Sequence, residues 1–336
     1  AGNRPEALYP QYDLYSVSAN YDGRPGMLIS QLGNPDLTWE RTYTTGFGID
    51  ASLWDNRLHF NLDLYSKKTD NILYNVPVTG LICVTNIYRN IGKMDNRGVE
   101  FAIGGDVIRS KDFTWSLDAN LGHNANKLTD IFRQYDATTG QFVAKPVIIG
   151  DGTGISGTAS RILEIGSPID TYYMKEWAGV NKEDGRPQWY KDDGKGGKVV
   201  TKNYAEADYY KLGNAAPKLF GGFSTNLRWR QLDFALAFGY SLGGQIYNYS
   251  RQEYDSDLAY ADRNQMVLRP GWSRWQKAGD EATHPRALYN NKDGGNKASS
   301  RYLEDASFLK LRSLSLGYNF SLPQLKIQSL RLYVNA

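Results

Sequence analysis

The sequence predicts an all-β fold that forms part of a large antiparallel transmembrane β-barrel with long loops, and three observations lead to this prediction. Apolar and polar residues alternate strictly through many segments of roughly ten residues, as in barrel strands that face lipid on one side. The connections between these segments are alternately short and long, which indicates an up-and-down meander. The polar faces carry mostly small side chains and the apolar faces end in aromatic residues, as at a bilayer interface.

Eight segments are the best strand candidates, and the expected total is eight to ten strands. The region 129–216 either adds a hairpin or remains one long loop. Strands of ten or more residues exceed the usual length in soluble sandwiches. The eight candidates cover residues 39–54, 57–74, 97–109, 113–128, 217–230, 232–249, 306–320 and 328–336.

The first two candidates form a hairpin around the polar pair Asp55 and Asn56. Along the first, one face carries Tyr43, Thr45, Phe47, Ile49, Ala51 and Leu53. Along the second, the apolar face carries Leu58, Phe60, Leu62 and Leu64. A soluble sandwich would turn its polar face to bulk water, where Lys, Glu and Thr are usual. As far as Tyr65, the polar faces carry mostly small polar residues and no Lys, which favours an enclosed interior and an apolar face in lipid.

The third and fourth candidates repeat the pattern across the short connection "RSKD" at 109–112. Their apolar faces carry Val99, Phe101, Ile103 and Val107 in the third and Phe113, Trp115, Leu117, Ala119 and Leu121 in the fourth. Several charged residues lie on polar strand faces, where we expect ion pairing inside the barrel rather than acid–base catalysis. These residues are Asp50, Asp63, Glu100, Asp106, Asp118 and Arg228.

The last four candidates complete the meander. The segments 217–230 and 232–249 meet at the turn "RWRQLD", and 306–320 and 328–336 meet at "LPQLKIQ". In "FLKLRSLSLGYNF" the alternation changes phase between Leu311 and Leu314. This slip indicates either a β-bulge or a position near the interface for Lys310 and Arg312.

The composition argues against several classes of protein. The chain has 39 basic and 36 acidic residues among 336, so no basic field indicates a nucleic-acid partner. No run of about 18 apolar residues predicts a transmembrane helix, although one short helix is expected within 257–279. The single cysteine, Cys83, is expected to be a small buried hydrophobe. The first and last residues both suggest a fragment of a longer protein.

The motifs do not predict catalysis, a cofactor or a metal site. Gly152, Gly154 and Gly157 have the spacing of a dinucleotide-binding loop, but the residues that follow are β-branched and interrupted by proline. The acidic clusters "NKEDGRPQWY" and "KDDGKGGK" lack the order of a calcium loop and are expected to form turns. His59, His123 and His284 have no metal-ligand spacing. The chain is therefore expected not to be an enzyme.

The long loops are rich in aromatic residues amid Asp, Asn and Arg. Such rings suit stacking on sugars or peptides, and the alternative is that they pack the loops against each other. The candidate ligand-binding residues are Trp189, Tyr190, Tyr254, Tyr260, Trp272 and Trp275.

Several blocks in series resemble the SusC/RagA-type TonB-dependent outer-membrane transporters. The stretch "GNPDLTWERTYTTGFGIDASLWDNRLHFNLDLYSKKTDNILYNVPV" resembles their G-N-P-x-L-x-W-E … N-R-L … D-Y-Y-x-K-x-T-x-x-L segment. "NIGKMDNRGVEF" resembles their N-x-G-x-x-x-N-x-G-x-E block. "GSPIDTYYMKEWAGVNKEDGRPQWYKDDG", "GNAAPKLFGGFSTNLRWRQLDFALAFGYSLGGQIYN" and "RYLEDASFLKLRSLSLGYNF…LRLYVNA" fit as well. The resemblance runs from about Gly33 to Ala336.

This resemblance implies a 22-stranded plugged barrel in the outer membrane of a Gram-negative bacterium. It implies import of oligosaccharides or peptides, TonB coupling through the N-terminal plug, and a SusD-like surface lipoprotein as a lid. Residues 1–336 would be the later portion of the barrel, without the plug and the first half. Regions 129–216 and 242–306 would be extracellular loops, and the turns near 55–56, 110–111, 230–231 and 323–327 periplasmic. The alternative is a non-transporting surface β protein, an adhesin or a glycan-binding module.

Overall fold

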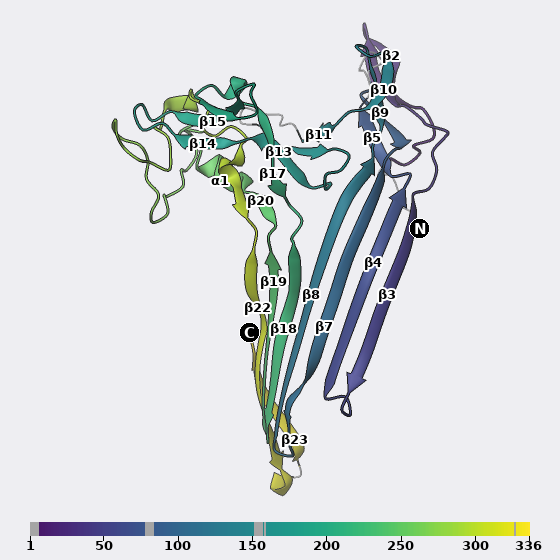
Figure 1. Cartoon of the computed structure of the whole chain (residues 1–336), viewed down its shortest axis with the longest axis vertical. Coiled ribbons are helices and arrows are strands. Elements are labelled where there is room, and N and C mark those ends of the chain that lie inside the picture. The colour runs from purple at the N-terminus through teal and green to yellow at the C-terminus, as the bar shows by residue number, and fades with distance from the viewer. Residues whose placement is uncertain (1–6, 78–83, 151–156, 158, 326) are drawn as a thin grey trace.

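The computed structural model describes residues 7–77, 84–150, 157, 159–325 and 327–336. Its main feature is a tall antiparallel sheet whose strands run side by side, with smaller sheets and loops gathered at one end (Figure 1). No helix in the described ranges is long and apolar enough to cross a membrane. The fold is therefore mostly β, as predicted.

Eight long strands make the main sheet, and they are the eight predicted segments. They neighbour each other in chain order, from β3 at one edge to β23 at the other, and every pair is antiparallel. No further strand of the described residues joins this sheet. The strands are β3 (Arg41–Leu53), β4 (Leu58–Asp70), β7 (Lys93–Arg109), β8 (Phe113–Asp130), β18 (Leu219–Trp229), β19 (Leu232–Leu242), β22 (Phe308–Leu322) and β23 (Ile327–Asn335).

Short turns join the strands at one end of the sheet, which we call the turn end. Between β3 and β4, Asp55 and Asn56 adopt φ of 55° and 64°, a conformation that these residue types tolerate well. The Arg57 N–H donates to the Trp54 carbonyl at 3.1 Å and closes this turn. Between β22 and β23 the connection is the short 3-10 helix η5 (Pro323–Leu325). The long connections all lie at the opposite end, the loop end (Figure 1).

The phase slip in β22 is a β-bulge, so the first of the two alternatives is confirmed. Phe238 pairs with Leu311 and Ala237 pairs with Ser313, which leaves Arg312 without a partner across the strand. The Arg312 side chain lies against Gly239, where an added Cβ would be 2.9 Å from its Nε atom. The bulge therefore restores the alternation while it places a cation beside the polar face.

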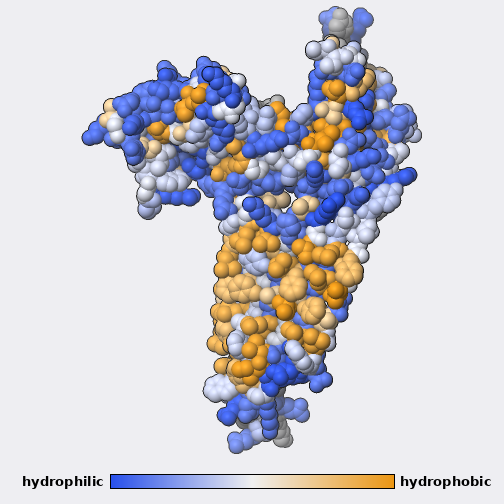
Figure 2. Space-filling model, in the orientation of Figure 1, coloured by the Kyte–Doolittle hydropathy of each residue, from blue (hydrophilic) through white to orange (hydrophobic). Residues whose placement is uncertain are grey.

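One face of the sheet is apolar and exposed. Figure 2 shows a band of hydrophobic residues over the long strands, bounded by hydrophilic residues at both ends. The indole N–H of Trp115 on this face is satisfied within the sheet, because Nε1 donates to Thr225 Oγ1 at 2.9 Å. A patch of this extent requires a partner, and a lipid bilayer fits its band shape. Exposed members include Tyr43, Phe47, Leu64, Ile103, Leu117, Phe223, Leu316 and Leu332.

The other face carries a ladder of polar contacts. His59 Nε2 lies 3.4 Å from Asp118 Oδ1, and Ser116 Oγ donates to Asp106 at 2.7 Å. Gly104 lies between His59 and Asp118, where a Cβ would be 2.1 Å from the Asp118 carboxylate. The glycine therefore allows this close approach. These contacts support the expected pairing of charges on the polar face.

The described residues of the region 129–216 add no hairpin to the main sheet, and the long connection that they form has strands of its own. Its described residues form nine short strands. They are β9 (Arg133–Asp136), β10 (Gln141–Ala144), β11 (Val147–Ile149), β12 (Arg161–Leu163), β13 (Thr171–Lys175), β14 (Trp177–Val180), β15 (Pro187–Asp192), β16 (Lys198–Thr201) and β17 (Tyr209–Asn214). The 3-10 helix η2 (Tyr204–Glu206) follows β16.

The region 242–306 is mostly irregular. Two short strands, β20 (Gln245–Tyr247) and β21 (Leu303–Asp305), pair with each other. The short helix expected within 257–279 lies earlier instead, as α1 (Tyr249–Tyr254), because the Asn248 side chain caps it by accepting from the Arg251 N–H. The remaining elements are η3 (Tyr289–Asn291) and η4 (Ser300–Tyr302), with the hairpins β1 (Leu14–Tyr21)–β2 (Arg24–Gln31) and β5 (Leu73–Pro77)–β6 (Asn86–Asn90) elsewhere at the loop end.

Candidate ligand-facing loop domain

Residues 159–216 and 243–306 pack together into one body, which we call the loop domain. At its centre Trp189 is fully buried, with its ring 5.8 Å from that of Trp177 and 5.2 Å from that of Tyr204, both edge-on. The Tyr204 hydroxyl donates to the carbonyl of Ala298 at 2.7 Å, which joins the two stretches of chain. The domain therefore has its own core, separate from the sheet below it.

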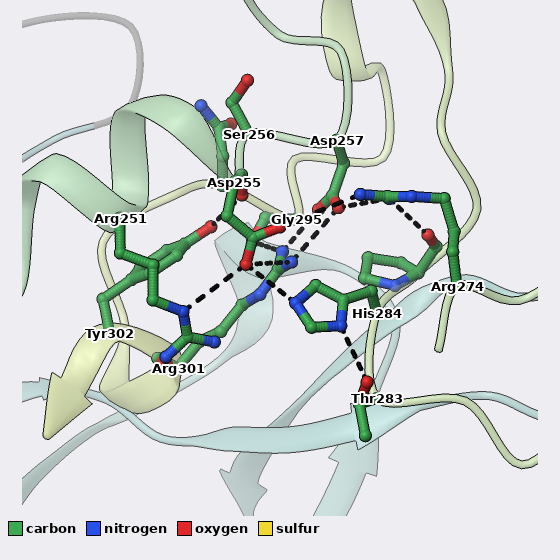
Figure 3. A network of polar contacts seen from close by, with 12 residues as sticks. Arg251, Asp255, Ser256, Asp257, Arg274, Thr283, His284, Gly295, Arg301 and Tyr302 are labelled. Carbon is green, nitrogen blue, oxygen red and sulfur yellow. Dashed lines mark hydrogen bonds and ion pairs between the residues drawn. The ribbon is translucent and has the colours of Figure 1, made fainter. Parts of the chain in front are cut away.

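A second buried centre is ionic. Figure 3 shows three arginines and one histidine converging on two aspartates, a set that we call the ionic cluster. Arg301 contacts both Asp257, through Oδ1 at 3.1 Å, and Asp255, through Oδ2 at 3.3 Å. The members are Arg251, Asp255, Asp257, Arg274, His284 and Arg301.

The remaining members complete the coordination of the two carboxylates. Arg274 Nη1 lies 2.7 Å from Asp257 Oδ1, and His284 Nε2 lies 2.9 Å from Asp255 Oδ2. The side chains of Asp255, Asp257 and Arg301 are each at most 2% exposed. Buried charges of this kind persist only when they are paired and hydrogen-bonded. The cluster therefore fixes α1, the 274–284 segment and η4 relative to one another.

Burial and pairing act in opposite directions on Asp255. Burial by itself favours the neutral acid, but the hydrogen bond with His284 and the charges of Arg301 and Arg251 outweigh it. The pKa of Asp255 therefore lies below its ordinary value of 3.8. The ionised form is the one that the folded loop domain stabilises.

Acid should therefore loosen the loop domain. Folded Asp255 binds a proton less readily than unfolded Asp255, so its stabilisation is full above about pH 4 and is lost as pH falls through the lowered pKa. The measurement is the urea midpoint of loop-domain unfolding, followed by tryptophan fluorescence from about pH 6 to about pH 2. An Asp255→Asn variant should start less stable and show a shallower acid slope. Equal slopes in both proteins would show that Asp255 does not contribute.

The three predicted tryptophans pack inside the loop domain. Trp189 is buried as described, and so offers no surface to a ligand in this conformation. Trp272 lies against the guanidinium of Arg251 at 4.6 Å and the ring of His284 at 4.9 Å. Trp275 donates from Nε1 to the Lys182 carbonyl at 2.9 Å, and its ring covers Gly185. These contacts fit the packing alternative, and a role of Trp272 and Trp275 in ligand binding stays a prediction.

Each of the three predicted tyrosines keeps some exposed surface. Tyr254 is 48% exposed at the end of α1. Tyr190 and Tyr260 are half-buried, with Lys198 5.7 Å and Arg263 4.6 Å from their respective ring centres. A role for these rings in ligand binding stays a prediction.

The acidic loops form turns, as predicted. Asn181 Oδ1 accepts from the N–H groups of Glu183 and Asp184, and Asp193 Oδ1 accepts from those of Lys195 and Gly197. In the part of the chain that the structure describes, no group of three or more His, Cys, Asp or Glu side chains has metal-binding geometry. Gly152 and Gly154 of the glycine-rich motif lie outside the described residues, as does Cys83.

Sequence reasoning missed the ionic cluster. Its members come from α1, from the "DSD" segment after it, from 274–284 and from η4, and all partners except Arg251 and Asp255 lie far apart in the sequence. The local signals were the spacing of four residues between Arg251 and Asp255 and the two aspartates separated by one residue, Asp255 and Asp257.

Comparisons with known proteins agree with this architecture. Residues 3–336 match the family model described as TonB dependent receptor-like, beta-barrel. TonB-dependent receptor P3 of Formosa agariphila is 29% identical over 92% of this chain, and SusC of Bacteroides thetaiotaomicron is 25% identical over 95%. The RagAB peptide importer in its closed-closed state superposes on 99% of the chain with a TM-score of 0.80 and 28% identity.

The chain spans only part of these relatives. It covers 30% of TonB-dependent receptor P3, 29% of SusC and 35% of the RagAB chain. The match nevertheless extends over nearly the whole chain and includes both the sheet and the loop domain. The chain belongs to the TonB-dependent receptor β-barrel family and is of the SusC/RagA type.

Proposed function

We propose that this chain is part of the barrel wall and the external loop domain of an outer-membrane importer of oligosaccharides or peptides. The observation that carries the proposal is the pairing of an eight-stranded sheet, apolar on one face and polar on the other, with a folded domain at one end. The family supports import, because RagAB, which the chain resembles at 28% identity, is a peptide importer. The polar face would line the passage and the loop domain would stand at its mouth.

Two partners follow from the same proposal. A SusD-like surface lipoprotein would cover the loop domain and deliver cargo. TonB would supply energy through the N-terminal plug of the full-length transporter. Outer-membrane lipid would cover the apolar face, and no nucleic acid is involved.

Uptake by cells tests the proposal. Cells that carry the full-length transporter and its lipoprotein are offered fluorescent oligosaccharides and peptides, with and without a protonophore. The expected result is accumulation that requires both the transporter and the proton-motive force. Surface binding without energy-dependent accumulation would instead indicate the adhesin or glycan-binding alternative.

The orientation follows from the lengths of the connections. Outer-membrane barrels keep short turns on the periplasmic side, so the loop end should face outward. A cysteine introduced at the exposed Ala261 in the loop domain should react with a membrane-impermeant maleimide on intact cells. A cysteine at Asn56 in the turn end should react only after lysis. Labelling at Asn56 but not at Ala261 on intact cells would show that the turn end faces outward, opposite to the proposed orientation.

The accessible rings are the candidates for contact with cargo. We propose that Tyr254 and Tyr260 stack on sugar or peptide groups, with Tyr190 as a further contact. A good stacking contact is worth about 1–3 kcal/mol, so Tyr254→Ala should weaken cargo binding roughly tenfold. Tyr289→Ala, which removes another exposed ring of the same domain, is the matched control. Equal affinities for the two variants would exclude Tyr254 from the contact.

A further inference from the structure

A pocket of about 600 Å³ opens on the loop domain, away from the ionic cluster. Three segments line it: the turn before β15, the stretch from the end of β16 through η2, and the turn 292–297 between η3 and η4. Most of its charged side chains are basic, so we call it the basic pocket. Its lining includes Arg186, Lys202, Tyr204, Lys292, Asp293 and Lys297.

The carboxylates near the basic pocket already form ion pairs with basic side chains. Asp293 contacts Arg286 at 2.8 Å and Arg186 at 3.4 Å. Glu206, which also lines the pocket, lies 3.3 Å from Lys191, which leaves it engaged outside the pocket. Lys202 is paired as well, with Asp184 at 2.8 Å.

Two lysines of the pocket remain uncompensated. Within the described ranges, neither Lys292 nor Lys297 forms an ion pair with a carboxylate. Both belong to one turn, and they stand at its two ends. The pocket therefore presents two free ammonium groups to whatever enters it.

A further cation lies behind the pocket wall. Lys175 is only 6% exposed, and its ammonium lies 4.3 Å from the centre of the Tyr204 ring, with Lys297 5.1 Å from the same ring. Lys175 hydrogen-bonds the Tyr204 carbonyl, and no ion pair with a carboxylate forms on it among the described residues. Burial first, and the neighbouring charge of Lys297 second, lower the pKa of Lys175. The Tyr204 ring therefore lies close to two like charges that repel each other.

Local contacts position the Lys297 side chain and the turn that carries both free lysines. Gly294 has φ of +72°, and a Cβ there would approach the Cδ and Cε atoms of Lys297 to 3.3 Å. The Lys297 side chain therefore folds back over Gly294. The contact of Asp293 with Arg186 fixes the same turn against the turn before β15. Lys297 is therefore a positioned part of the pocket wall, while Lys292 lines the same pocket with an exposed side chain.

We propose that the basic pocket binds a carboxylate group of the cargo. This inference rests on the proposed import function and narrows it to acidic cargo, either an acidic peptide or a uronate-bearing oligosaccharide. A carboxylate placed between Lys292 and Lys297 accepts hydrogen bonds from both and relieves the repulsion of these two cations and Lys175. The volume of the pocket accommodates one residue or one sugar ring with its acid group.

Binding to the purified full-length transporter tests the proposal. The probes are a Glu-rich pentapeptide with its Gln counterpart, and trigalacturonate with its methyl ester, each measured by calorimetry. One acidic probe should bind at least about tenfold more tightly than its neutral counterpart, since charge-assisted hydrogen bonds are the stronger kind. Which acidic probe binds identifies the peptide or the sugar as the source of the carboxylate. That preference should shrink as salt is raised.

Matched variants locate the effect. Lys292→Gln combined with Lys297→Gln should weaken binding of the acidic probe about tenfold and leave binding of its neutral counterpart unchanged. Lys292→Arg with Lys297→Arg keeps the charge and should retain most of the binding. The control replaces Lys195 and Lys277 by Gln, because both are exposed in the loop domain and line no part of this pocket.

The outcomes separate this inference from the proposed function. Equal affinity for acidic and neutral probes would overturn the proposal that the basic pocket binds a carboxylate. An equal loss of affinity in the pocket and control variants would overturn it as well. Energy-dependent uptake of neutral cargo in the same cells would then leave the import function standing. Failure to accumulate any cargo would overturn the import function itself, whatever the lysines bind.

Discussion

Replacing Arg301 by Met should open the loop domain while the barrel stays folded. Arg301 is buried between Asp255 and Asp257, and its loss leaves two buried carboxylates with fewer positive partners. Breaking a buried pair on one side costs about 3–5 kcal/mol, because the remaining charge is uncompensated. If opening limits cleavage, proteinase K should cut the 242–306 segment at least roughly a hundredfold faster in the variant.

A surface ion pair of the same domain provides the control. Arg161 lies 3.0 Å from Asp170, but both side chains are about a third or more exposed. Exposed pairs contribute about 1 kcal/mol or less, so Arg161→Met should alter the cleavage rate by only a small factor. Retention of the heat-modifiable band on gels would show that the barrel survives in both variants. Equal cleavage rates would mean that the ionic cluster does not hold the loop domain together.

A lysine on the apolar face should cost far more than one on the polar face of the same strand. Ile103 and Ala102 are neighbours in β7 that point to opposite faces, and Ile103 is 39% exposed on the apolar band. Lysine near the bilayer midplane of a barrel costs about 2–4 kcal/mol on the lipid face. At Ala102 the new side chain would lie between Asn61 and Asn120 of the flanking strands.

Folding of the full-length transporter into lipid vesicles measures this difference. Ile103→Lys should lower the free energy of unfolding by that amount, and Ala102→Lys should lower it by less than about 1 kcal/mol. The two variants differ by one position and add the same side chain, so each controls for the other. A larger loss at Ala102 would mean that the assignment of the faces is inverted.

The long strands were predictable because the alternating pattern that forms each of them is local in the sequence. Each needs only alternation along ten or so residues, which Leu58, Phe60, Leu62 and Leu64 of β4 display directly. Their ends were less certain. The segment expected to run to 249 stops at Leu242, because Gly243 adopts φ of +79° and turns the chain, and β20 then pairs with β21 instead.

The loop domain was not predictable in the same way. Trp189 looks like a ligand platform in the sequence, beside Tyr190 and charged residues, but its ring is enclosed by Trp177 and by Tyr204. Arg301 meets Asp257 across 44 residues, and no local pattern marks that contact. Long-range packing decides which aromatic rings are buried and which charges are paired, and a single sequence does not display it.

The most direct test of the central claim is the environment of successive side chains along β19. Nitroxide labels at Ala235, Leu236, Ala237 and Phe238 of the full-length transporter in bilayers are read by collision with oxygen and with a water-soluble nickel chelate. Because Leu236 and Phe238 lie on the apolar face, their labels should collide mainly with oxygen. The labels at Ala235 and Ala237, on the polar face, should favour the chelate, which gives a period of two residues. High chelate accessibility at all four positions would show that both faces contact water, and would contradict a transmembrane barrel wall.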